Sequence, residues 1–209
     1  MNRVTRIVVA TFGVLLGISG MNHGFFEVLQ GNTPTNGLII QAIGPAHRMW
    51  VHGTEEAFTL IPNFLVTGIL AITVGLVIIV WSVGFVHKKY GPLVFILLFV
   101  LLFLVGGGIG QVVFFTLAWA FATQINKPLT WWRKILSANV RGALAPVWPG
   151  SLTVGSLLFL FALEIAIAGF VPGLNNPEQK LYLCWSLLGL TLAAYCLTFV
   201  SGFARDIQS

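Results

Sequence analysis

The stretch Leu104-Val-Gly-Gly-Gly-Ile-Gly-Gln111 lies near the middle of an apolar run that extends over residues 92–123. Four of the five positions from 106 to 110 are glycine: Gly106, Gly107, Gly108 and Gly110. Glycine costs about 1 kcal/mol per residue in a helix interior relative to alanine, so a continuous helix is weakest here. The stretch therefore predicts a backbone break, at which the chain enters and returns on the same side of a membrane. The alternative is one long tilted helix whose glycines allow close packing.

Composition sets the class of protein around this stretch. Of the 209 residues, 57% are hydrophobic and only 8% are charged, and the mean hydropathy is +0.92. Soluble domains carry roughly a quarter charged residues, and about 20 apolar residues span a bilayer as a helix. We therefore predict an all-α, multi-pass integral membrane protein that folds as a single domain over residues 1–209. The expected apolar helical segments are 6–28, 60–86, 92–123, 151–172 and 181–203.

The distribution of Lys and Arg bears on the path of the central run. With five simple crossings, five Lys and Arg residues lie on the side of the N-terminus and six on the other side, which contradicts the usual cytoplasmic excess. If segment 92–123 instead returns, only Arg48 and Lys180 lie opposite the N-terminus. The charges thus favour a returning segment and a cytoplasmic N-terminus. The Lys and Arg residues flank apolar runs and form no combined basic and aromatic surface, so nucleic-acid binding is not expected.

Glycines at helical spacing predict helix-packing faces. The first segment carries four glycines in steps of four, three and four, and the second carries two that are seven residues apart. Such positions share one side of a helix and let another backbone approach closely. These faces suit packing within a bundle, a partner helix or a second copy of the chain. The residues are Gly13, Gly17, Gly20, Gly24, Gly68 and Gly75.

The connection before the fourth segment predicts an interfacial amphipathic helix at 131–144. Its basic residues cluster on one side of a helix, and tryptophans and aliphatic residues take much of the rest. Tryptophan favours the headgroup level of a bilayer, and basic groups favour anionic lipid. Membrane lipids are therefore the expected partner of Trp131, Trp132, Arg133, Lys134 and Arg141.

Histidines and acids gather at the end of the first segment and in the loop that follows it. His23 and Glu27 are one helical turn apart and share a face. The loop adds His47, Arg48, His52, Glu55 and Glu56. Imidazole and carboxylate groups suit a divalent metal, for which His23, Glu27, His47 and His52 are the candidate ligands. The same cluster also fits a proton relay, an outer gate held by ion pairs with Arg48, or an ordinary polar loop.

Glu164 is a second candidate for chemistry because it lies near the centre of the expected fourth segment. A charge at the middle of a membrane helix costs at least about 2.5 kcal/mol on insertion scales, and acids placed there usually mark ion or substrate paths. We therefore expect Glu164 to handle protons or ions. A protonated carboxyl bonded across a helix interface is the alternative.

Three classes of function remain open from the sequence. A small-solute or ion channel or permease, proton-linked through Glu164, is favoured by the intramembrane acid and the glycine break. A metal-dependent membrane enzyme would use the outer His and Glu cluster, and a non-catalytic membrane subunit or assembly factor would use the glycine faces. No phosphate-binding loop, nucleophile elbow or haem-attachment motif occurs, so the sequence does not decide whether the chain is an enzyme.

Overall fold

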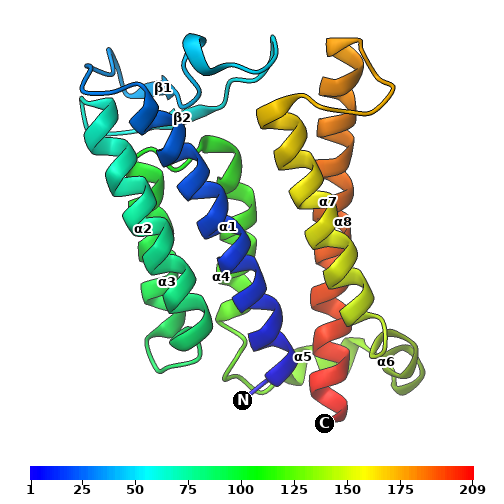
Figure 1. Cartoon of the computed structure of the whole chain (residues 1–209). Coiled ribbons are helices and arrows are strands. Elements are labelled where there is room, and N and C mark those ends of the chain that lie inside the picture. Colours follow the sequence, from blue (N-terminus) through cyan, green and yellow to red (C-terminus); the bar gives the residue numbers. More distant parts are fainter.

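The computed structural model describes all of residues 1–209 and is mainly helical (Figure 1). Its only sheet is one antiparallel pair of three-residue strands in the loop after the first helix. In chain order the elements are α1 (Arg3–Leu29), β1 (Ile39–Gln41), η1 (Pro45–His47), β2 (Glu56–Phe58), α2 (Phe64–Gly84), α3 (Gly91–Leu104), η2 (Ile109–Gln111), α4 (Val112–Ala122), α5 (Thr130–Ile135), α6 (Ala138–Leu144), α7 (Trp148–Ala168) and α8 (Pro177–Gln208).

Four helices, α1, α2, α7 and α8, are long and apolar enough to cross a membrane. They correspond to four of the five expected apolar segments. The last is longer than expected, since α8 has 32 residues and rises about 48 Å. Its final turns lie beside the start of α1, where the Asp206 carboxylate accepts hydrogen bonds from the Val4 and Thr5 amides at 2.9 and 2.8 Å. The N- and C-termini therefore lie at the same end of the molecule, here called the termini end (Figure 1).

The glycines expected at packing faces lie mainly on the contact between α1 and α2. A Cβ atom on Gly24 would lie 2.5 Å from the carbonyl oxygen of Gly68, and one on Gly17 would lie 2.8 Å from that of Gly75. The two backbones are thus in direct contact, which no larger residue at these positions would permit. The other two glycines meet side chains: Gly13 faces Ser82, and Gly20 faces Leu102.

The remaining expected segment, 92–123, is not one helix. It consists of α3 and α4, which are about 21 and 17 Å long, joined by the glycine stretch and the single turn of η2. Gly106 has φ +106° and Gly108 has φ +70°, values in the left-handed region that favours glycine. The glycines thus provide the conformations that interrupt the helix.

The two ends of this segment lie side by side. The Asn126 side-chain amide donates to the His87 carbonyl oxygen at 2.7 Å. The backbone N–H of Asn2 donates to the Ile125 carbonyl oxygen at 2.7 Å. Residues before α3 and after α4 are therefore both at the termini end. The chain runs up along α3, reverses at the glycine stretch and returns along α4 (Figure 1).

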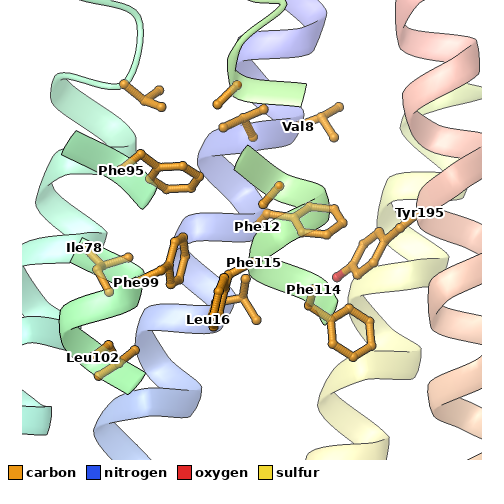
Figure 2. Close-up of a cluster of buried hydrophobic side chains, with 14 of the residues drawn as sticks. Val8, Phe12, Leu16, Ile78, Phe95, Phe99, Leu102, Phe114, Phe115 and Tyr195 are labelled. Carbon is orange, nitrogen blue, oxygen red and sulfur yellow. The ribbon is translucent and has the colours of Figure 1, made fainter. Parts of the chain in front are cut away.

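Aromatic side chains hold this hairpin inside the bundle. Phe99 of α3 stacks on Phe115 of α4 with ring centroids 5.1 Å apart, and Phe12 of α1 meets Tyr195 of α8 at 3.8 Å. Figure 2 shows these rings in one cluster together with Phe95. The core of the fold is the contact of α1 with α2, the hairpin and α8.

The prediction of a single amphipathic helix at 131–144 is wrong. The chain forms α5 and α6, which are separated at Leu136, where the backbone is extended with φ −91° and ψ 104°. The Ser137 hydroxyl caps α6 by accepting from the Val140 amide, and the Arg141 guanidinium donates to the Leu136 carbonyl oxygen at 2.8 Å. A serine that caps a new helix competes with continuation of the old one, which accounts for the break.

Charge is separated along the long axis of the molecule. Nine of the eleven Lys and Arg residues belong to elements at the termini end, whereas Asp206 is the only acid there. The nine are Arg3, Arg6, Lys88, Lys89, Lys127, Arg133, Lys134, Arg141 and Arg205. This is the distribution that the sequence predicts for a returning central segment.

Candidate functional site

A row of buried polar side chains follows one face of α1. Ser19, His23 and Glu27 are spaced by four residues, so they lie one above another on the helix. All three are buried, with exposed fractions of 3%, 5% and 0%. Because polar groups are costly to bury in an apolar bundle, this row marks the α1 face as a candidate functional site.

The glycine stretch closes over this row. A Cβ atom on Gly106 would lie 2.5 Å from both carboxylate oxygens of Glu27, and one on Gly108 would lie 2.5 Å from His23 Nε2. Only glycine leaves room for the carboxyl and the imidazole here. The two features that stand out in the sequence, the glycine break and the His23–Glu27 pair, thus meet at one site.

The reversal is held by hydrogen bonds to α2 and to the loop between α1 and α2 (residues 30–63), here called the outer loop. The Thr67 hydroxyl donates to the Val105 carbonyl oxygen at 2.8 Å and lies 2.6 Å from the Thr59 hydroxyl. The Gly106 amide donates to the Phe58 carbonyl oxygen at 3.0 Å. The break is therefore an ordered structure with its backbone partly satisfied by neighbouring residues, as expected for non-helical backbone inside an apolar bundle.

Gln111, the last residue of the glycine stretch, extends the polar row toward the middle of the bundle. Its amide nitrogen donates to the Ser19 hydroxyl at 3.1 Å, and its amide oxygen is buried without a hydrogen-bond partner. Beyond Ser19 the α1 face continues with Leu16 and Phe12, both of which are buried. The polar row thus ends on the aromatic core.

Glu27 is the acid most deeply enclosed by the protein. Its side chain has no exposed surface, and neither carboxylate oxygen has a hydrogen-bond partner. A buried polar group left without a partner costs about 1–3 kcal/mol, and more if it is charged. Burial of the Glu27 carboxyl therefore destabilises the folded protein, and no hydrogen bond in the structure offsets this.

His23 forms an ion pair with Glu55 of the outer loop through Nε2, whereas its Nδ1 atom is buried without a partner. Burial acts to raise the pKa of Glu55, but the charge of His23 and its hydrogen bond to Glu55 lower that pKa below the usual 4.5. The pair connects α1 to the loop and presents an imidazole and a carboxylate at the outer end of the bundle.

A small cavity adjoins this pair. Its volume is about 10 Å³, roughly the space for one water molecule. The lining residues come from α1, the outer loop and α7: Asn22, His23, Phe26, Ala42, Ile43, Glu55, Leu163 and Ile167. The site has no room for a larger substrate in this conformation, so the structure is a closed state of any path that reaches it.

The outer loop is fastened to α7 and α8 beside the cavity. The Trp50 indole N–H donates to the Ala166 carbonyl oxygen at 3.1 Å, and its ring lies against Gly169. His52 Nε2 lies 2.8 Å from a Glu178 carboxylate oxygen near the start of α8. These two contacts form a latch, defined here as Trp50–Ala166 and His52–Glu178, that joins the outer loop to α7 and α8.

The other members of the predicted outer cluster do not converge on His23 and Glu27. Arg48 donates to the Gln41 side chain and forms no ion pair with an acid. His47 lies in η1, and Glu56 is exposed on β2. No group of three or more His, Cys, Asp or Glu side chains is placed to hold a metal ion, so the geometry gives the metal-site hypothesis no support.

Glu164 is not near the centre of its helix. It lies four residues before the end of α7, its side chain is exposed, and it forms neither a hydrogen bond nor an ion pair. Because α7 ends at Ala168 with Gly169 in the left-handed region at φ +60°, the helix stops earlier than the apolar run suggests. Glu164 is therefore separate from the polar row.

Comparisons with known proteins add no assignment. No protein-family model matches the sequence, and neither a curated protein nor a solved structure matches it. The functional argument therefore rests on the site itself.

Several residues of the site are not singled out by the sequence analysis. Ser19 could have been recognised, because it precedes His23 by four residues as His23 precedes Glu27. Trp50 and Glu178 carry no such signal, since their contacts join segments more than 100 residues apart.

Proposed function

We propose that the chain crosses a membrane with α1, α2, α7 and α8, and that α3 and α4 form a re-entrant hairpin between them. The lengths and hydropathy of the four helices support the crossings. The hydrogen bond between Asn126 and His87 supports the return of the hairpin to its side of entry. The excess of basic residues at the termini end supports a cytoplasmic N-terminus, and with it a position of α5 and α6 at the cytoplasmic interface.

We propose further that the protein is an ion channel that conducts protons, with Glu27 and His23 as the proton carriers. The observation that supports this most directly is the buried Glu27 carboxyl, which has no partner and is enclosed by the glycine break. Acids buried in this way in membrane helices usually serve ion or proton paths. The proposal rests on Glu27 and not on Glu164.

Each member of the row has a part in the proposed path. The His23–Glu55 pair lies beside the outer cavity, where the imidazole can exchange a proton with water from the outer side. Glu27 is one turn away on the same helix face, and Ser19 and Gln111 continue the polar surface inward. Since Leu16 and Phe12 close the inner half, transfer requires the α3–α4 hairpin to separate from α1.

The test uses the purified protein in liposomes that enclose a pH-sensitive dye. A potassium gradient with valinomycin drives protons inward, and the rate of internal acidification is measured. We expect the wild type to acidify the lumen faster than protein-free liposomes, and Glu27→Gln to reduce the protein-dependent rate at least tenfold. A wild-type rate equal to that of empty liposomes would contradict the proposal.

Glu164→Gln is the matched control because it makes the same chemical change at an exposed position. We expect its rate to equal that of the wild type. Loss of flux in Glu164→Gln with normal flux in Glu27→Gln would instead assign the path to α7.

A further inference from the structure

A second, larger recess lies at the termini end, far from the polar row. Its volume is about 400 Å³, within the range of small-molecule sites. It is formed by the end of α4, the connection that follows it, α5 and α8. Nine residues line it, of which four are aromatic and two are polar: Phe121, Trp131, Trp132 and Phe203, and Gln124 and Thr130.

The aromatic wall is an assembled structure. The Trp132 and Phe203 ring centroids are 4.8 Å apart, and those of Phe121 and Phe203 are 5.3 Å apart, so α5 and α4 are both joined to α8 through Phe203. Trp131 contacts Trp132 at 4.9 Å but is itself largely exposed. The recess therefore has a packed apolar floor and an open aromatic edge.

Uncompensated positive charge lies on the segments that form the recess. Lys127, Arg133 and Lys134 are exposed on the segments that line it, and none of them forms an ion pair. The only acid at the termini end, Asp206, already accepts hydrogen bonds from the amides at the start of α1. An occupant that is apolar at one end and anionic at the other would satisfy both features.

We infer that the recess binds an anionic phospholipid, with one acyl chain against the aromatic floor and the phosphate beside Lys127, Arg133 and Lys134. The charge supplies the selectivity, since each cation is expected to strengthen binding of the anionic lipid over a zwitterionic one about fivefold. The acyl chain exchanges one apolar environment for another, so it contributes by its fit to the recess. The inference depends on the membrane location proposed above but not on the proton path, so it survives if Glu27 carries no flux.

The test uses the protein in phosphatidylcholine nanodiscs that contain a small, varied fraction of phosphatidylglycerol with a photoreactive acyl chain. After illumination, labelled peptides are identified by mass spectrometry. We expect saturable labelling of peptides that contain residues 120–132 and Phe203. The same photoreactive chain on phosphatidylcholine should label them at least tenfold less. Labelling that rises linearly with probe, or that is equal for both lipids, would overturn the inference.

Two pairs of variants separate the chain site from the charge site. Ala120→Trp fills the recess from an exposed position on α4 and should reduce labelling at least tenfold, whereas Ala143→Trp, exposed on α6 outside the recess, should not. Replacing Lys127, Arg133 and Lys134 by Gln should reduce labelling by phosphatidylglycerol at least tenfold, whereas Lys88→Gln/Lys89→Gln should leave it unchanged. Equal labelling of Ala120→Trp and the wild type would show that no chain enters the recess.

Discussion

Replacement of Glu27 by methionine should stabilise the protein while it abolishes proton flux. The Glu27 side chain has no exposed surface, and both carboxylate oxygens lack a partner. Methionine has a similar length and no group that requires a hydrogen bond, so it removes the cost of burying the carboxyl. That cost is about 1–3 kcal/mol for an unsatisfied buried group, and we expect the free energy of unfolding to rise by this amount.

The assay is reversible unfolding in mixed micelles with an increasing fraction of denaturing detergent, followed by tryptophan fluorescence. Glu164→Met is the matched control, because the same exchange at an exposed position should change the free energy of unfolding by less than about 0.5 kcal/mol. A decrease of more than about 1 kcal/mol in Glu27→Met would refute the reasoning. It would mean that the carboxyl has a stabilising partner in the folded protein, and the argument that Glu27 is retained for function would fail.

Three further predictions concern the elements around Glu27. Gly106→Ala should lower the midpoint of the same unfolding transition and reduce proton flux. The added Cβ would meet the Glu27 carboxyl, and φ +106° disfavours alanine. An unchanged midpoint would contradict this. Trp50→Ala should open the latch, so that the rate of amide hydrogen exchange in the outer loop rises at least tenfold while the rate in α3 stays constant. A loop exchange rate equal to that of the wild type would count against a latch. Because the pKa of Glu55 is lowered in the folded protein by His23, its stabilising effect is complete above about pH 5 and is lost as the pH falls below 4.5. The difference in unfolding temperature between the wild type and Glu55→Gln should accordingly shrink on acidification through that range, and a difference that is constant with pH would refute it.

Much of the architecture could be predicted from the sequence, because it depends on local patterns. Apolar runs of about 20 residues indicate helices of spanning length, and the structure contains four such helices. Glycines at steps of three and four predict close-packing faces, and in the structure the faces of α1 and α2 contact each other. A glycine cluster in an apolar run predicts a weak point for a helix, and the helix is interrupted there.

The site was predicted only in part, because its contacts join distant segments. His23 and Glu27 are recognisable from their spacing, but nothing in the sequence places Gly106 and Gly108 against them. The loop histidines appeared to form one cluster because they are close in sequence. In the structure His23 pairs with Glu55 and His52 pairs with Glu178, which separates them.

The expectation for Glu164 shows how a helix boundary affects a functional argument. The apolar run suggests a segment that continues to residue 172, with Glu164 near its centre. Gly169 adopts the left-handed conformation and ends α7 at Ala168, so that Glu164 lies about one turn from the end. An error of four residues at one boundary thus moves an acid from the middle of a helix to its end.

The central claim is that the chain reverses at the glycine stretch and returns to its side of entry, which brings this stretch onto the polar row of α1. It is tested most directly by single cysteines at the exposed positions Lys88 and Lys127, in a background in which Cys184 and Cys196 are replaced by serine. Sealed vesicles of known orientation are treated with a thiol reagent that does not cross membranes, and Glu56→Cys reports the opposite side. We expect Lys88→Cys and Lys127→Cys to be modified from the same side and Glu56→Cys from the other. Modification of Lys88→Cys and Lys127→Cys from opposite sides would contradict it.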